Sequence, residues 1–257
     1  MDDDSVLKEK PLRYAGQSLD EELDRISNDE AVAPFAGVAA AYAFCLGIWT
    51  GWFFGSWAHA LFATVLLFPL TIWATLHVRK QMKLARNMRQ GRDGERRVGQ
   101  LLECLRADGY VIFHDVVADN FNVDHVVVGP SGIFAVETKT WGSSGSRKHK
   151  IEFNGREVRN LDSATPIWDK SPIDQASRQA TYVAGLIERV TGTRDIVIPV
   201  VLFVDRYVSY TENTSKVSVE VLNPKMLQGR LRKMPSRLTS ERIRQIELQL
   251  TAELTKQ

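Results

Sequence analysis

The pattern of hydrophobic and polar positions divides the chain into parts of different character. Residues 31–78 contain no Asp, Glu, Lys or Arg, so 48 consecutive residues carry no formal charge. The residues that follow show a helical spacing of apolar positions up to Leu105. Beyond Gly109, short runs rich in β-branched residues alternate with helical segments. This order predicts an apolar helical region followed by a soluble α/β domain.

The uncharged stretch is long enough for two membrane-spanning helices, since each needs about 20 apolar residues. The pattern places them at residues 34–50 and 57–78, joined by a turn rich in Gly, Trp and Phe. Six Lys and Arg side chains follow between Arg79 and Arg92, which predicts a multi-pass protein of the inner (cytoplasmic) membrane with both termini cytoplasmic. The alternative is a buried helical hairpin in a soluble protein, but a soluble helix nearly always has one polar face.

The remaining elements follow from spacing and turn residues. A helical stretch at 79–107, expected as one helix or as two divided around Gly91–Gly94, ends at Gly109. Strands are expected at 110–117, 122–128, 133–141, 195–205 and 217–222, with a hairpin at 150–159 around Asn154-Gly155. Helices are expected at 171–190, 224–233 and 240–254, the first of them capped by Ser171-Pro172. The order predicts an α/β sandwich with a mixed sheet flanked by helices.

Charge follows the same division and suggests partners. Residues 1–30 have a net charge of −6, whereas residues 79–257 have a net charge of +8. The basic part suits a polyanionic partner such as nucleic acid, although its juxtamembrane share also suits the headgroups of a lipid bilayer. Two Cys exclude a disulfide scaffold. We expect an acidic segment at 1–30, spans at 31–78, a basic linker at 79–90, the main domain at 91–222 and terminal helices at 223–257.

Chemistry is suggested by two carboxylates and a lysine on neighbouring predicted strands. Glu137 and Lys139 are two residues apart, so they project from the same face of a strand. The turn at 129–132 would pair that strand with the one that carries Asp124. Asp124 and Glu137 could then hold a hard divalent cation such as Mg²⁺, and Lys139 could orient a metal-activated water. This is a usable arrangement for hydrolysing a phosphodiester bond.

The same residues also allow a plainer interpretation. A Glu-x-Lys triplet is common by chance, and it then forms a solvated ion pair of little energetic value. Glu137, however, follows Gly-Ile-Phe-Ala-Val, an otherwise apolar strand in which a charge is costly unless it is paired or bound to a metal.

Three sequence motifs resemble the nuclease-related domain, NERD, a branch of the PD-(D/E)XK nuclease-like superfamily. They are Gly91-Arg92-Asp93-Gly94-Glu95, the segment from Asn122 to Gly142 that contains Asp124 and Glu137-Thr138-Lys139, and Ser171-Pro172 with Gln175. The resemblance covers residues 91–190 and implies a restriction-endonuclease-like mixed sheet. It also implies a nuclease that uses Mg²⁺ or Mn²⁺, with DNA favoured over RNA as substrate.

The resemblance assigns roles to individual residues. Glu95 would be the acid on the helix, Asp124 and Glu137 the metal-binding carboxylates, and Lys139 the catalytic lysine. Gln175 would be the polar helix residue that supports the site, and the backbone carbonyl of Thr138 would help to bind the metal. Two of these have equally simple structural explanations, since Glu95 suits a helix N-terminus and Gln175 an exposed first turn.

Other polar and aromatic residues lie near these motifs. Asp115 and Asp119 are further acids that loop solvation would explain equally well, and His125 should face away from Asp124. Trp141 could stack on a base or pack in the core, and the basic segment 142–150 could follow a phosphate backbone or be solvated.

Three functional classes are compatible with the sequence. The first is a membrane-anchored, metal-dependent nuclease-like enzyme. The second is a non-catalytic nucleic-acid-binding or signalling module with the same fold. The third is a scaffold in a membrane complex.

Overall fold

The computed structural model describes residues 12–26, 32–51, 57–140, 150–161, 171–211 and 218–256. Of these, the residues up to Ser18 and from Gln90 onward form one compact unit, and residues 19–89 form a second. The expected turn between the two apolar helices, Trp141 and most of the basic segment 142–150 lie outside the described residues.

The second unit is helical. It contains most of α1 (Gln17–Arg25), the whole of α2 (Val32–Gly51) and the first part of α3 (Trp57–Glu103). Large apolar side chains are exposed along α2 and α3, among them Phe44, Phe62, Val65 and Phe68. Within the part of the chain that is described, no helix combines the length and the apolar character needed to cross a membrane.

The helix α3 shows that the first of the two alternatives, a single helix, applies, because it runs without a break through Gly91 and Gly94. Gly94 is buried, and a Cβ at this position would lie 1.8 Å from Thr140 Cγ2. This glycine therefore permits close packing of the helix instead of ending it. The helix is followed by the 3-10 helix η3 (Cys104–Asp108), which stops at Gly109 with a φ of 82°, as expected.

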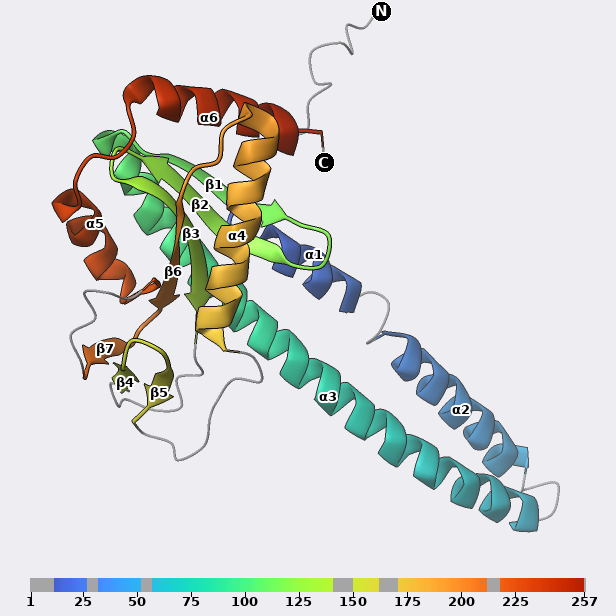
Figure 1. The fold of residues 1–257 in the computed structure, drawn as a ribbon. Coiled ribbons are helices and arrows are strands. Elements are labelled where there is room, and N and C mark those ends of the chain that lie inside the picture. Colours follow the sequence, from blue (N-terminus) through green and yellow to red (C-terminus); the bar gives the residue numbers. More distant parts are fainter. Residues whose placement is uncertain are drawn as a thin grey trace, which may run out of the picture. The chain divides into compact units, whose positions relative to one another are not determined.

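The core of the first unit is a mixed five-stranded sheet in the order β1-β2-β3-β6-β8, which confirms the predicted α/β class (Figure 1). Its strands are β1 (Val111–Val117), β2 (Asn122–Gly129), β3 (Gly132–Lys139), β6 (Val197–Phe203) and β8 (Glu220–Leu222). The first three pair antiparallel, and β6 lies parallel to both β3 and β8.

Helices cover both faces of this sheet. One face packs against α4 (Pro172–Thr191) and α6 (Ser240–Leu254), with Ile133, Ala135, Val183 and Ile246 in the core between them. The other face packs against the end of α3, η3 and α5 (Pro224–Lys233). The expected start of α4 is confirmed, because Ser171 Oγ accepts a hydrogen bond from Asp174 N at 3.3 Å.

A second, three-stranded sheet was only partly predicted. The expected hairpin is present as β4 (Lys150–Phe153) and β5 (Val158–Asn160). The sequence did not indicate β7 (Tyr207–Tyr210), which pairs parallel to β4. This pairing joins segments more than 50 residues apart, so no local sequence pattern predicts it.

Candidate active site

The two antiparallel strands β2 and β3 bring Asp124 and Glu137 together. Their register pairs His125 with Val136, so Asp124 and Glu137 face each other one step further along. Asp124 Oδ2 accepts a hydrogen bond of 2.6 Å from the backbone N of Thr138. The predicted pairing of the two acidic strands is therefore present in the structure.

Glu137 is buried, with only 2% of its surface exposed. Its Oε1 lies 2.5 Å from Lys139 Nζ, and its Oε2 accepts a hydrogen bond of 2.5 Å from Gln179 Nε2. Each carboxylate oxygen thus has one partner, which offsets the cost of burying the charge.

Lys139 links the sheet to the helix α4. Its Nζ donates to Gln175 Oε1 at 2.9 Å in addition to its contact with Glu137. Gln175 is therefore held in the site by a direct hydrogen bond, and the alternative of an exposed first-turn residue does not apply.

Gln179 also belongs to the site, although the sequence pattern did not identify it. It lies four residues after Gln175, on the same face of α4, and is 1% exposed. Its Nε2 also donates to the backbone O of Asn122 at 3.0 Å, and its Oε1 has no hydrogen-bond partner among the described residues. The spacing from Gln175 was the one available signal, because both residues project toward the sheet.

Glu95 approaches the same region from α3. Burial, together with the negative charges of Asp115 and Glu137, raises the pKa of Glu95 to about 8, against the opposing effect of Lys139. Glu95 is thus within electrostatic range of the other acids, although no hydrogen bond joins it to them in the described part of the chain. The same reasoning holds for Asp124, whose pKa is raised by burial and by the charges of Glu137 and Glu95.

A further acid, Asp115, is paired with the N-terminal segment. Asp115 interrupts the β1–β2 ladder opposite Asp124 with a positive φ of 49°. Its carboxylate accepts hydrogen bonds from Arg13 Nε at 3.0 Å and from Ser18 N at 2.7 Å. Residues 12–18 therefore attach to the domain beside the site, which the sequence did not suggest.

His125 lies on the other face of β2, as the strand alternation predicted. It is fully buried, and its Nδ1 is 2.9 Å from His114 Nδ1. His114 Nε2 in turn contacts Glu103 at 2.8 Å. Burial, followed by the nearby His114, lowers the pKa of His125 well below its usual range, so the ring is neutral and structural.

The arrangement suits a hard cation in its chemistry. Carboxylate oxygens are the ligands that Mg²⁺ prefers, and a cation would offset both the burial and the mutual repulsion that raise the pKa of Asp124 and of Glu95. The unpartnered Gln179 Oε1 offers a further acceptor for a metal-bound water. Within the described residues, no group of three His, Cys, Asp or Glu side chains is placed so that it could hold a metal ion.

Comparison with known protein families gives a match for the segment that contains the site. Residues 90–204 match the nuclease-related domain, NERD. The NERD region begins within α3, ends just after β6 and contains all the predicted site residues together with Gln179. The match supports the resemblance to the nuclease-related domain over this region. Comparison with curated proteins and with solved structures gave no match.

Proposed function

We propose that the protein is a membrane-tethered, metal-dependent nuclease-like enzyme that hydrolyses phosphodiester bonds, with DNA as the favoured substrate. The observation that carries the proposal is the buried Glu137, held between Lys139 and Gln179 and facing Asp124 within a NERD region. A charged group is retained in an apolar strand at a cost, which points to chemistry instead of packing.

Asp124 and Glu137 would hold Mg²⁺ or Mn²⁺, with the backbone carbonyl of Thr138 as a further ligand. When bound, the cation polarises the phosphate and makes a water molecule acidic. Gln179 fixes the orientation of the Glu137 carboxylate, since it donates to Oε2 and is itself anchored on the backbone of Asn122. These contacts keep the carboxylate in one position before any ligand arrives.

Lys139 has two roles in this proposal. Its ammonium group compensates the charge of Glu137 and would face negative charge on the phosphate or on the attacking water. Gln175 restrains the flexible lysine through the 2.9 Å hydrogen bond, so the ammonium group remains near the carboxylates. Glu95, with its raised pKa, is the group best suited to hold a proton at this site near neutral pH.

The membrane tether is the second part of the proposal. Its support is the uncharged stretch 31–78 and the cluster of Lys and Arg residues that follows it. The exposed side chains of Phe44, Phe62 and Phe68 agree with it, because a lipid bilayer would cover large apolar side chains that the protein itself leaves exposed. The tether would place the enzyme at the cytoplasmic face of the inner membrane.

The test is a cleavage assay with the purified full chain in detergent. Labelled single- and double-stranded DNA and RNA are incubated with Mg²⁺, Mn²⁺ or EDTA. We expect metal-dependent cleavage that Asp124→Asn lowers by about a thousandfold, since a metal supplies several kcal/mol of charge stabilisation. Asp119→Asn, a nearby change outside the site, should cleave like the wild type. Binding without cleavage in the presence of each metal would instead identify a nucleic-acid-binding module. If the protein neither binds nor cleaves nucleic acid, the remaining hypothesis is a scaffold in a membrane complex.

A further inference from the structure

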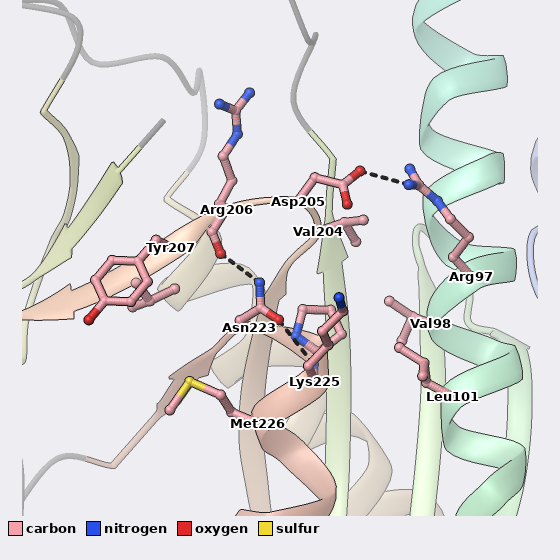
Figure 2. Close-up of a pocket in the computed structure, with 12 residues that line it drawn as sticks. Arg97, Val98, Leu101, Val204, Asp205, Arg206, Tyr207, Asn223, Lys225 and Met226 are labelled. Carbon is pink, nitrogen blue, oxygen red and sulfur yellow. Dashed lines mark hydrogen bonds and ion pairs between the residues drawn. The ribbon is translucent and has the colours of Figure 1, made fainter. Parts of the chain in front are cut away.

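A cavity of about 620 Å³ lies at the carboxyl end of β6 (Figure 2). It is formed by the end of α3, the segment between β6 and β7, and the start of α5. This volume lies in the range of about 300–1,000 Å³ that is usual for small-molecule sites. Among the described residues, none of those assigned to catalysis lines it.

The backbone connects this cavity directly to the site. Val204, which lines the cavity, donates a hydrogen bond of 3.0 Å to the carbonyl of Lys139. Arg97, another lining residue, follows Glu95 by two positions on α3, so the two side chains leave the helix on different sides. The cavity lies on the face of the sheet that α3 and α5 cover, whereas Glu137 and Lys139 face α4, so the carboxyl edge of β3 and β6 separates the cavity from the acidic site.

The walls of the cavity are largely apolar and include an accessible aromatic ring. Tyr207 and Met226 lie on one side and Val98 and Leu101 on the other (Figure 2). Tyr207 is 61% exposed, Met226 49% and Leu101 44%, so these large side chains are not buried in the core and are accessible to a ligand. A flat, uncharged ring of the ligand could pack between them.

The rim of the cavity carries an exposed basic side chain, Lys225. Arg206 is only 5% exposed, and Arg97 donates a hydrogen bond of 2.7 Å to Asp205 Oδ2, so the charges of Arg97 and Asp205 compensate each other. The positive charge of Lys225 favours a ligand that carries an anionic group as well as a ring.

We propose that this cavity binds one unpaired nucleotide of the nucleic acid, across the carboxyl edge of β3 and β6 from the acidic site. The base would stack on Tyr207 between the apolar walls, and a flanking phosphate would face Lys225. A base inside a duplex cannot enter such a pocket without leaving its stack. The substrate class is therefore single-stranded nucleic acid or an unpaired end, an inference that rests on the proposed function.

The proposal is tested with the full chain in detergent and EDTA, so that binding is measured without cleavage. The probes are a fluorescently labelled eight-nucleotide single strand, as DNA and as RNA, and a blunt duplex of the same length. We expect the single strand to bind more tightly than the duplex. Tyr207→Leu should weaken single-strand binding by about tenfold, because it removes the stacking ring. Tyr207→Phe keeps the ring and should bind within twofold of the wild type.

Charge is tested separately. Lys225→Gln should lower the slope of log K against log salt by about one, as expected for one lost phosphate contact. Lys233→Gln, an exposed change at the other end of α5, is the matched control and should leave the slope closer to that of the wild type. Melting temperatures of all variants establish that the surface substitutions leave the fold intact.

Each outcome decides the proposal. If the wild type binds and cleaves nucleic acid but Tyr207→Leu and Lys225→Gln bind as tightly, the pocket assignment is wrong and the proposed function stands. If the duplex binds as tightly as the single strand, the substrate class is wrong. If the wild type neither binds nor cleaves any of the probes, the proposed function fails and the pocket assignment fails with it. Single-strand binding that depends on Tyr207 without any cleavage would support the pocket while rejecting the enzyme.

Discussion

At the scale of single residues, the charges of the site are balanced by side-chain contacts. Some of these contacts can be predicted from the sequence and others cannot. The meeting of Asp124, Glu137 and Lys139 follows from strand alternation and a short turn, so it could be predicted. The contact between Gln179 and Glu137 depends on how α4 packs on the sheet, which local spacing does not determine. The ion pair between Asp115 and Arg13 joins residues 102 positions apart and has no local signal.

Gln179 should act as a positioning residue for Glu137. The change Gln179→Met keeps the size of the side chain but removes the donor to Glu137 Oε2. We expect cleavage to fall by about ten- to a hundredfold and the Mg²⁺ concentration for half-maximal rate to rise, as for other residues that orient metal ligands. Gln228→Met, the same change on α5, is the control. An unchanged Mg²⁺ requirement in Gln179→Met would show that this residue is merely structural.

Glu95 should make the stability of the metal-free protein depend on pH. Its pKa rises from an ordinary value of 4.5, which applies in the unfolded chain, to about 8 in the folded protein. Between these values the folded state keeps a proton that the unfolded chain releases, so stability is full below the lower pKa and is lost as the pH rises through the higher one. The slope is at most about 1.4 kcal/mol per pH unit.

The measurement is thermal unfolding of the full chain in EDTA from about pH 4 to pH 9. We expect the melting temperature of the wild type to fall with rising pH relative to that of Glu95→Gln, whose side chain does not titrate. Parallel curves for the two proteins would contradict the raised pKa of Glu95.

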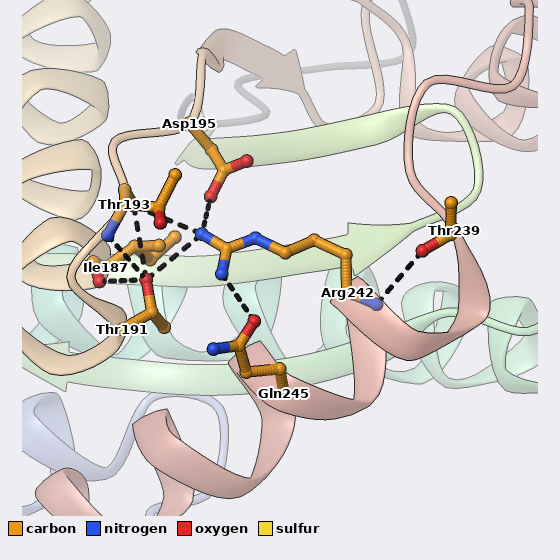
Figure 3. Close-up of polar contacts among 7 residues, drawn as sticks. All are labelled: Ile187, Thr191, Thr193, Asp195, Thr239, Arg242 and Gln245. Carbon is orange, nitrogen blue, oxygen red and sulfur yellow. Dashed lines mark hydrogen bonds and ion pairs between the residues drawn. The ribbon is translucent and has the colours of Figure 1, made fainter.

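At the scale of elements, tertiary packing overrides local preference in α3. Glycine lowers helix stability by about 1 kcal/mol relative to alanine, and two glycines therefore favoured a boundary in the sequence. The helix continues because Gly94 lies directly against Thr140. Other junctions are held by side chains, as where Arg242 of α6 pairs with Asp195 and with Thr191 at the end of α4 (Figure 3).

The close packing at Gly94 predicts opposite effects for two similar substitutions. Gly94→Ala should destabilise the protein by about 1–3 kcal/mol, because the new methyl group overlaps Thr140 Cγ2. Gly185→Ala on α4, where a Cβ meets nothing within 4 Å, should stabilise it by about 0.5–1 kcal/mol.

Denaturant unfolding of the full chain measures both changes. Adding Thr140→Ser to Gly94→Ala removes the overlapping Cγ2 and should restore most of the loss. If Gly94→Ala were as stable as the wild type, the close contact between α3 and Thr140 would be refuted.

At the scale of the whole molecule, the sequence predicts the class of the main sheet. It does not predict the contacts between segments that lie far apart in the chain. The mixed sheet followed from the order of helical and β-rich segments. The small sheet of β4, β5 and β7 and the attachment of residues 12–18 did not, because each joins segments far apart in the chain. Such contacts depend on the completed fold, and the residue pattern reports only local preferences.

The membrane tether predicts how the full chain fractionates in cells. We expect it to remain with the membrane pellet after alkaline carbonate extraction. Two charges introduced at exposed positions of α3, Val65→Lys with Phe68→Lys, should release much of it, since each central charge costs about 2.5–3.5 kcal/mol on insertion. Leu248→Lys, at an exposed apolar position of α6, should remain in the pellet. A wild-type protein recovered in the supernatant would reject the tether.

The most direct test of the central claim is the single-turnover rate of phosphodiester cleavage at saturating Mg²⁺, compared between the wild type and Glu137→Gln. The substitution keeps the shape of the side chain and removes the charge that faces Lys139. If this buried carboxylate forms the catalytic centre, the rate should fall by about a thousandfold or more, while Glu152→Gln on β4 should cleave like the wild type. Equal rates for Glu137→Gln and the wild type would contradict the account.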